Sequence, residues 1–148
     1  MDDQAALEVA FEQARIGRAE GGVPIGAALI IDGRVAGAGH NRRVQLGSAI
    51  RHGETDALEN AGRLPASAYR RATMATTLSP CDMCTGAILL YGIRRVVIGE
   101  NRTFLGAEDL LRARGVEIVN LDSAACYELL QAFIREHPDV WNEDISEE

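Results

Sequence analysis

The sequence predicts one α/β layered domain built around a mixed β-sheet. Short apolar runs of strand length alternate along the chain with amphipathic segments of helix length. The first two runs are joined by a tight-turn signal, so they should pair antiparallel, whereas strands separated by helices usually pair in parallel. The length of 148 residues suits a single domain with one substantial core.

The first half of the chain is expected to contain a helix, a hairpin and a second helix. Residues 5–20 carry apolar side chains every three or four positions, which predicts an amphipathic helix. Residues 25–31 form an apolar run, Asp32-Gly33 is a hairpin signal, and residues 34–38 return as the second strand. A second helix is predicted over residues 53–61.

The second half continues the alternation of strands and helices, which favours parallel pairing of its strands. The expected elements are a strand at 74–78 after a loop through Pro65, a helix from the cysteine motif to about Tyr91, a strand at 95–98, a loop and helix within 105–114, a strand at 116–121, a helix at 123–136, and an acidic tail from Pro138.

Composition limits the possible partners of the protein. Hydrophobic residues make up 47% and charged residues 25%, as in ordinary globular domains, and no apolar stretch approaches the ~20 residues of a membrane helix. The acidic start of the chain lacks a signal-peptide pattern, so we expect a cytoplasmic protein without a membrane partner. The net charge is −7 and all fifteen basic residues are Arg, which argues against nucleic acid and favours a small uncharged molecule.

Three potential zinc ligands and one free carboxylate lie in two short motifs. His52-Gly53-Glu54 offers an imidazole and a carboxylate, and Pro80-Cys81-Asp82-Met83-Cys84 offers two thiols. Cys81 and Cys84 are three residues apart, so on a helix they share a face and can bind one ion. Three protein ligands leave a position for water, which is typical of catalytic zinc. Together the motifs are the signature of zinc-dependent nucleobase deaminases, with Glu54 as the group that moves protons.

The cysteine motif should open a helix. Ser79 is a candidate N-cap and Pro80 suits the first helical position, which would put both thiols in a first turn whose free N–H groups favour thiolates. The alternatives are a redox dithiol or two inert core cysteines. No fourth Cys or His lies at zinc-finger spacing, which counts against a closed structural site. Cys126 stands alone and is expected in the core.

Beyond the metal motifs, the chain resembles the fungal-type cytosine deaminases of the cytidine-deaminase-like superfamily nearly from end to end. The segments that carry the resemblance are Gly21–Gly26, Gly39-His40-Asn41, Leu58-Glu59-Asn60, Thr76–Ala87, Gly99-Glu100-Asn101, and Trp141 with Glu143-Asp144-Ile145.

The resemblance implies a cytoplasmic homodimer of three-layer α/β/α sandwiches, each with a five-stranded sheet and one Zn²⁺, that hydrolyses cytosine to uracil and ammonia in pyrimidine salvage. Residues 137–148 would form a tail that covers the substrate. The implied substrate contacts are the side chains of Asn41 and Asp144, the backbone of Gly53 and Ser79, and the rings of Phe104 and Trp141 as a lid.

These assignments make physical sense, because amide and carboxylate groups can recognise the edge of a planar base. Other interpretations remain open: Asn41 could shape its loop, Trp141 could be ordinary tail packing, and Asp144 could be part of a solvated acidic tail. His40 is interpreted as structural. Isocytosine, guanine or a creatinine-like cyclic amidine is an alternative substrate, and a transfer-RNA editing enzyme or a non-catalytic zinc or redox module is a further alternative.

One departure from the fungal pattern follows the first motif. Thr55-Asp56 stands where that pattern has an apolar residue and a small hydroxyl. Asp56 is four residues after His52, so it could support the imidazole, or it could be a first-turn acid favoured by the helix dipole.

Overall fold

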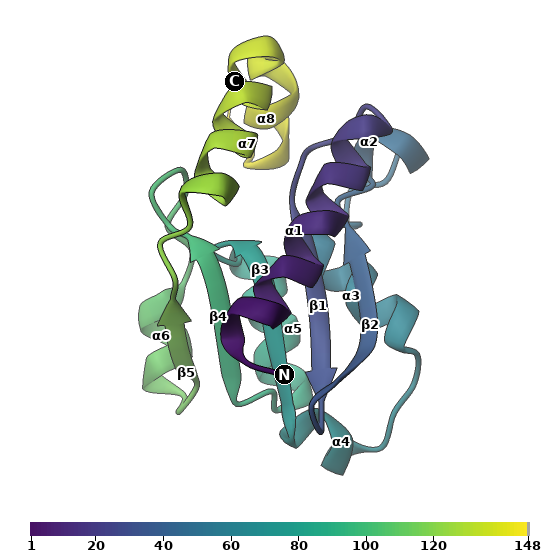
Figure 1. Ribbon diagram of the computed structural model, residues 1–148, viewed down its shortest axis with the longest axis vertical. Coiled ribbons are helices and arrows are strands. Elements are labelled where there is room, and N and C mark those ends of the chain that lie inside the picture. Colours follow the sequence, from purple (N-terminus) through teal and green to yellow (C-terminus); the bar gives the residue numbers. More distant parts are fainter. Residues whose placement is uncertain (148) are drawn as a thin grey trace.

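The computed structural model describes residues 1–147, which form a mixed five-stranded sheet with helices on both faces (Figure 1). The last residue of the predicted domain, Glu148, lies outside the described residues. The elements are α1 (Asp3–Ala19), β1 (Gly26–Ile31), β2 (Arg34–His40), α2 (Arg43–Leu46), α3 (Gly53–Ala61), α4 (Ala66–Arg70), β3 (Ala72–Leu78), α5 (Asp82–Tyr91), β4 (Arg95–Glu100), α6 (Glu108–Ala113), β5 (Glu117–Asn120), α7 (Ala124–Glu136) and α8 (Pro138–Asp144).

The sheet has the strand order β2-β1-β3-β4-β5. β1 pairs antiparallel with both β2 and β3, whereas β3, β4 and β5 are parallel to one another. The parallel strands are joined through α5 and α6, as crossover connections require. The predicted mixed sheet and three-layer α/β/α arrangement are confirmed.

Successive side chains of a strand point to opposite faces of the sheet, so the strands contribute to two apolar cores, one on each face. In β1, Leu29 points to the face covered by α3, α5 and α6, and its neighbour Ile30 points to the face covered by α1 and the start of α7. Cys126 belongs to the second of these cores and is buried, as expected. Figure 1 shows α1 crossing one face, with α3 and α5 behind the other.

Two glycines in β2 let α3 lie unusually close to the sheet. A Cβ atom at Gly37 would lie 2.5 Å from the backbone nitrogen of Ala61, and one at Gly39 would lie 2.6 Å from that of Ala57. Any side chain at these positions would push the helix outward. The first turn of α3, which carries the His-x-Glu motif, is therefore held against β2.

A third apolar cluster closes the end of the sheet where the parallel strands finish. It joins the segment before β1 and the end of β3 to α7 and α8, and its buried members are Val23, Ile25, Leu78, Leu130, Phe133 and Trp141. In Figure 1, α7 and α8 stand above this end of the sheet. In sheets with parallel strands, ligands usually bind at the carboxyl ends of those strands.

The structure differs from the sequence predictions mainly in short helices. α4 is a short helix within the loop predicted through Pro65, α2 is a single turn in a segment for which no element was predicted, and the acidic tail forms α8, which begins at Pro138. The predicted N-cap at Ser79 is wrong, because α5 begins at Asp82 with Cys81 as its N-cap. Among residues 1–147, no helix combines the length and apolar character needed to cross a membrane.

Candidate metal centre and adjoining cavity

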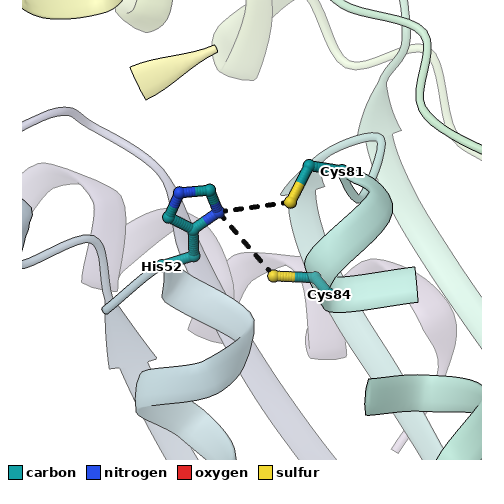
Figure 2. A group of neighbouring side chains, drawn as sticks. All are labelled: His52, Cys81 and Cys84. Carbon is teal, nitrogen blue, oxygen red and sulfur yellow. Dashed lines mark hydrogen bonds between the residues drawn. The ribbon is translucent and has the colours of Figure 1, made fainter. Parts of the chain in front are cut away.

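The predicted ligands His52, Cys81 and Cys84 lie together, with their donor atoms all within 4.8 Å of one another. The Nδ1 atom of His52 is 3.4 Å from Cys81 Sγ and 3.8 Å from Cys84 Sγ, and Figure 2 shows the imidazole facing the two sulfurs. A tetrahedral zinc ion with ordinary Zn–N and Zn–S bonds separates such atoms by about 3.6 Å. The donor types and their spacing therefore fit zinc.

Two helix starts hold these ligands. His52 is the N-cap of α3, where its backbone nitrogen donates to the Thr55 hydroxyl at 2.9 Å, and that hydroxyl donates to the Ile50 carbonyl at 2.7 Å. Cys81 is the N-cap of α5 and Cys84 lies in its first turn. Thiolates at a helix N-terminus are stabilised by its free N–H groups and dipole.

The far side of the His52 ring is held by the C-terminal helix. The Nε2 atom lies 2.7 Å from Asp144 Oδ1, so a proton on Nε2 leaves the Nδ1 lone pair free for a metal. Burial opposes protonation of the ring, but hydrogen bonds with Asp144 and Cys81 raise the pKa of His52 to about 10. Asp144 also accepts a hydrogen bond from Asn41 Nδ2 at 2.8 Å.

The two thiols differ in acidity. A hydrogen bond with Cys84 lowers the pKa of Cys81 to about 4 against the opposing effect of burial, and the same contact raises the pKa of Cys84 above its ordinary value. Glu54 is only 4% exposed, and burial raises the pKa of its carboxyl group despite the nearby His52. A carboxyl group with a raised pKa is suited to accept and then release a proton near neutral pH.

A cavity next to the ligands gathers nearly all the predicted site residues. Its lining combines the polar side chains of Asn41, Glu54 and Asp144 with aromatic and aliphatic ones. Its lining residues are Ile25, Asn41, His52, Glu54, Leu78, Ser79, Cys81, Phe104, Trp141, Asp144 and Ile145. Gly53 is not among them: it is buried at the start of α3 against the backbone of Ile25 and Gly26.

The hydroxyl group of Ser79 makes two hydrogen bonds within the protein. Its hydroxyl donates to Glu108 Oε2 at 2.6 Å and accepts from the backbone nitrogen of Gly106 at 2.9 Å. Glu108 is itself buried at the start of α6 and contacts Asn101. Sequence reasoning missed Glu108, because an acidic residue in a first helical turn usually needs no partner beyond the helix dipole.

Of the two interpretations left open for Asp56, direct support of the imidazole is wrong. Its carboxylate instead binds Arg42 and Arg51 and accepts from the backbone nitrogen of His40. His40 is structural as predicted: it is buried, with its ring nitrogens 2.8 Å from Gln13 Oε1 and 2.7 Å from Glu20 Oε1.

Comparisons with known proteins point to one family. A family model described as the cytidine and deoxycytidylate deaminase zinc-binding region matches residues 1–100. The chain is 58% identical over 147 residues to a cytosine deaminase from Candida albicans, covering 99% of this chain and 98% of that protein. It is 31% identical over 140 residues to a tRNA-specific adenosine deaminase from Streptococcus pyogenes, covering 88% of each. A solved guanine deaminase from Nitrosomonas europaea has a TM-score of 0.70 at 27% identity, covering 88% of this chain and 83% of that chain.

Proposed function

The chain belongs to the family of cytidine and deoxycytidylate deaminases, and from that premise we propose that it is a zinc-dependent enzyme that hydrolyses cytosine to uracil and ammonia. The observation that carries this proposal is the 58% identity to a cytosine deaminase over nearly the whole chain. The relative that acts on transfer RNA is more distant, at 31% identity. The resemblance to the cytosine deaminases is thereby confirmed.

Glu54 is the proton carrier in this proposal. Zinc held by His52, Cys81 and Cys84 would lower the pKa of a water molecule at its open position. Glu54 accepts a proton from that water and passes it to the ring nitrogen beside the amino-bearing carbon, which makes this carbon electrophilic. After the resulting hydroxide attacks this carbon, Glu54 takes the remaining proton from the newly added hydroxyl group and delivers it to the amino nitrogen, so that the ring carbonyl forms as ammonia leaves. Its burial and raised pKa support both steps.

Asn41 is the proposed reader of the carbonyl edge of the base. Its Nδ2 donates to Asp144, and its Oδ1 accepts from the backbone nitrogen of Arg43 at 3.0 Å. These two contacts fix the orientation of the amide and leave one N–H for a ring carbonyl. Asp144 would accept from a ring N–H, and the backbone of Ser79 would complete the polar edge. The same role is proposed for the backbone of Gly53, which lies between the lining residues His52 and Glu54 in the sequence.

The proposed cover of the ring consists of Phe104, from the segment between β4 and α6, and Trp141, from the tail formed by residues 137–148. Trp141 is buried in the cluster that joins α8 to α7, and both aromatic side chains line the cavity. Aromatic rings can stack on a planar base. Because α8 contributes Trp141 and Asp144 to the cavity lining, we expect this arrangement to suit a free base better than a nucleoside or a nucleic acid.

We also propose that the protein is a cytoplasmic homodimer that acts in pyrimidine salvage. α5 carries apolar side chains that are unusually open to solvent: Leu90 is 76% exposed, Tyr91 43% and Met83 37%. Large exposed apolar side chains clustered on one helix favour a protein interface. Replacing Leu90 by Asp should convert a dimer into a monomer in analytical ultracentrifugation, and an unchanged sedimentation coefficient would contradict the use of this face.

The function is tested by replacing the proton carrier while keeping the metal. Glu54→Gln should retain one zinc per chain and lose nearly all ammonia release from cytosine. Glu59→Gln, an exposed carboxylate on the same helix, is the matched control and should remain active. Equal turnover by Glu54→Gln and the control would refute the proposed mechanism.

The substrate is tested with a panel of rings. Ammonia release should be greatest with cytosine and small with isocytosine, guanine, creatinine-like amidines and cytidine. A preference for guanine would instead match the structural relative that deaminates guanine. A gel-shift at physiological salt tests the transfer-RNA alternative, and zinc-free protein with a reversible disulfide between Cys81 and Cys84 would favour the redox alternative.

A further inference from the structure

The buried carboxylate of Asp56 takes no part in the proposed reaction, but it links the chain segments that carry two residues of the cavity. We propose that Asp56 is a positioning residue that holds the zinc ligand His52 and the base reader Asn41 in a fixed relation, acting through Arg51 and Arg42. The role of Asn41 in this inference rests on the proposed function, whereas the hold on His52 does not.

Asp56 accepts four hydrogen bonds although none of its surface is exposed. Its Oδ1 receives Arg51 Nη2 at 2.8 Å and Arg51 Nε at 3.1 Å. Its Oδ2 receives Arg42 Nε at 3.1 Å and the backbone nitrogen of His40 at 3.0 Å. Hydrogen bonds between charged groups are about twice as strong as neutral ones. The carboxylate is therefore a strong junction between two chain segments.

The two arginines are direct chain neighbours of the two site residues. Arg42 follows Asn41, and Arg51 precedes His52. The backbone joins the same segments, because the nitrogen of Arg42 donates to the carbonyl of Arg51 at 2.9 Å. Any rotation or shift of one segment is thus resisted by the other.

Asp144 bridges the same pair of residues from inside the cavity. One of its oxygens contacts Asn41 and the other contacts His52. The two site residues are consequently held on both sides: by Asp144 at their side chains and by Asp56 behind their backbones. A misplacement of about 1 Å in such a site is enough to weaken binding or catalysis strongly.

The arginines keep part of their surface in water, which reduces the desolvation penalty of the network. The side chain of Arg42 is 34% exposed and that of Arg51 is 29% exposed, while Asp56 is fully buried. A buried carboxylate without partners would be strongly unfavourable. Each arginine can therefore be replaced singly while the other still compensates the charge of Asp56. Single variants thus separate the effect of the link through Arg42 from that of the link through Arg51.

The experiment measures zinc affinity by competition with a chromogenic chelator, and KM and kcat on zinc-loaded protein with cytosine. Partners behind metal ligands typically alter metal affinity or activity by about 10- to 100-fold. Arg51→Ala should weaken zinc binding about tenfold, and Arg42→Ala should raise KM about tenfold with zinc affinity unchanged. Asp56→Asn should produce both changes together. Arg34→Ala, an exposed arginine at the far end of β2, is the control.

A role limited to stability would give a different result. Asp56→Asn would then melt at a lower temperature but retain wild-type zinc affinity and KM, which would overturn the inference. If this variant does not fold, the two arginine variants decide: identical effects of both, or no effect of either, would also overturn it. If wild-type protein released no ammonia from cytosine, the proposed function would fail, while zinc affinity would still test the hold on His52.

Discussion

Replacing Asp144 by Ala should damage metal binding and substrate binding together. The carboxylate is almost fully buried, and it lies 2.8 Å from Asn41 Nδ2 and 2.7 Å from His52 Nε2. Hydrogen bonds to a charged group contribute about 1.5–3 kcal/mol each. Loss of one such bond to the substrate or to its reader corresponds to about a 10- to 150-fold change in an equilibrium constant.

We therefore expect KM for cytosine to rise at least tenfold, and zinc affinity to fall by about 10- to 100-fold because the imidazole loses the partner of its Nε2. KM is measured by ammonia release on zinc-saturated protein, and zinc affinity by chelator competition. Asp139→Ala, which removes an exposed carboxylate from the same helix, should change neither value. Wild-type KM and zinc affinity in Asp144→Ala would show that the tail carboxylate supports neither the ring nor the ligand.

Three further predictions test the scaffold and the electrostatics. Gly39→Ala should cost about 1–3 kcal/mol in urea unfolding, since its Cβ would lie 2.6 Å from a backbone nitrogen of α3; unchanged stability would mean that the helix can move aside. The hydrogen bond from Arg95 lowers the pKa of Asp3, so its stabilisation is present above the ordinary value of 3.8 and is lost as pH falls through the lowered pKa. Asp3→Asn should thus destabilise by at most about 1 kcal/mol at pH 7, and the difference should vanish in acid; a pH-independent difference would contradict this reasoning. Zinc binding at pH 7 should release about two protons, because the pKa of His52 is about 10 and that of Cys84 is raised; calorimetry in buffers of different ionisation enthalpy counts them, and a count of zero would contradict these protonation states.

The features predicted best from the sequence are those that depend on short spacings. Cys81 and Cys84 are three residues apart, so helix geometry already brings them to one face, and His52 and Glu54 are close in sequence at the start of one helix. The longer helices and all five strands of the described chain also fall near their predicted ranges, because their apolar periods extend over enough residues to be distinguished.

The features predicted poorly depend on contacts between distant segments. The bond between Asn41 and Asp144 joins residues 103 positions apart, and from the tail sequence alone Asp144 resembles any solvated acid; only the family resemblance indicated its place. Helical spacing left open whether Asp56 contacts His52 or is a first-turn acid, and it could not show that two arginines bind its carboxylate. The single turns α2 and α4 are too short to show a hydrophobic period.

The cavity is lined by segments from different parts of the chain, and this arrangement indicates where substrate specificity could be altered. All three metal ligands lie between positions 52 and 84, on helices that start against the sheet, whereas Trp141 and Ile145 come from the end of the chain. A library of variants confined to these two tail positions would reshape the cavity lining at the proposed cover of the ring while leaving the metal ligands and their helices as they are. New specificities can therefore be selected there without altering the metal ligands, provided that each variant is also screened for stability, because Trp141 is buried in the third apolar cluster.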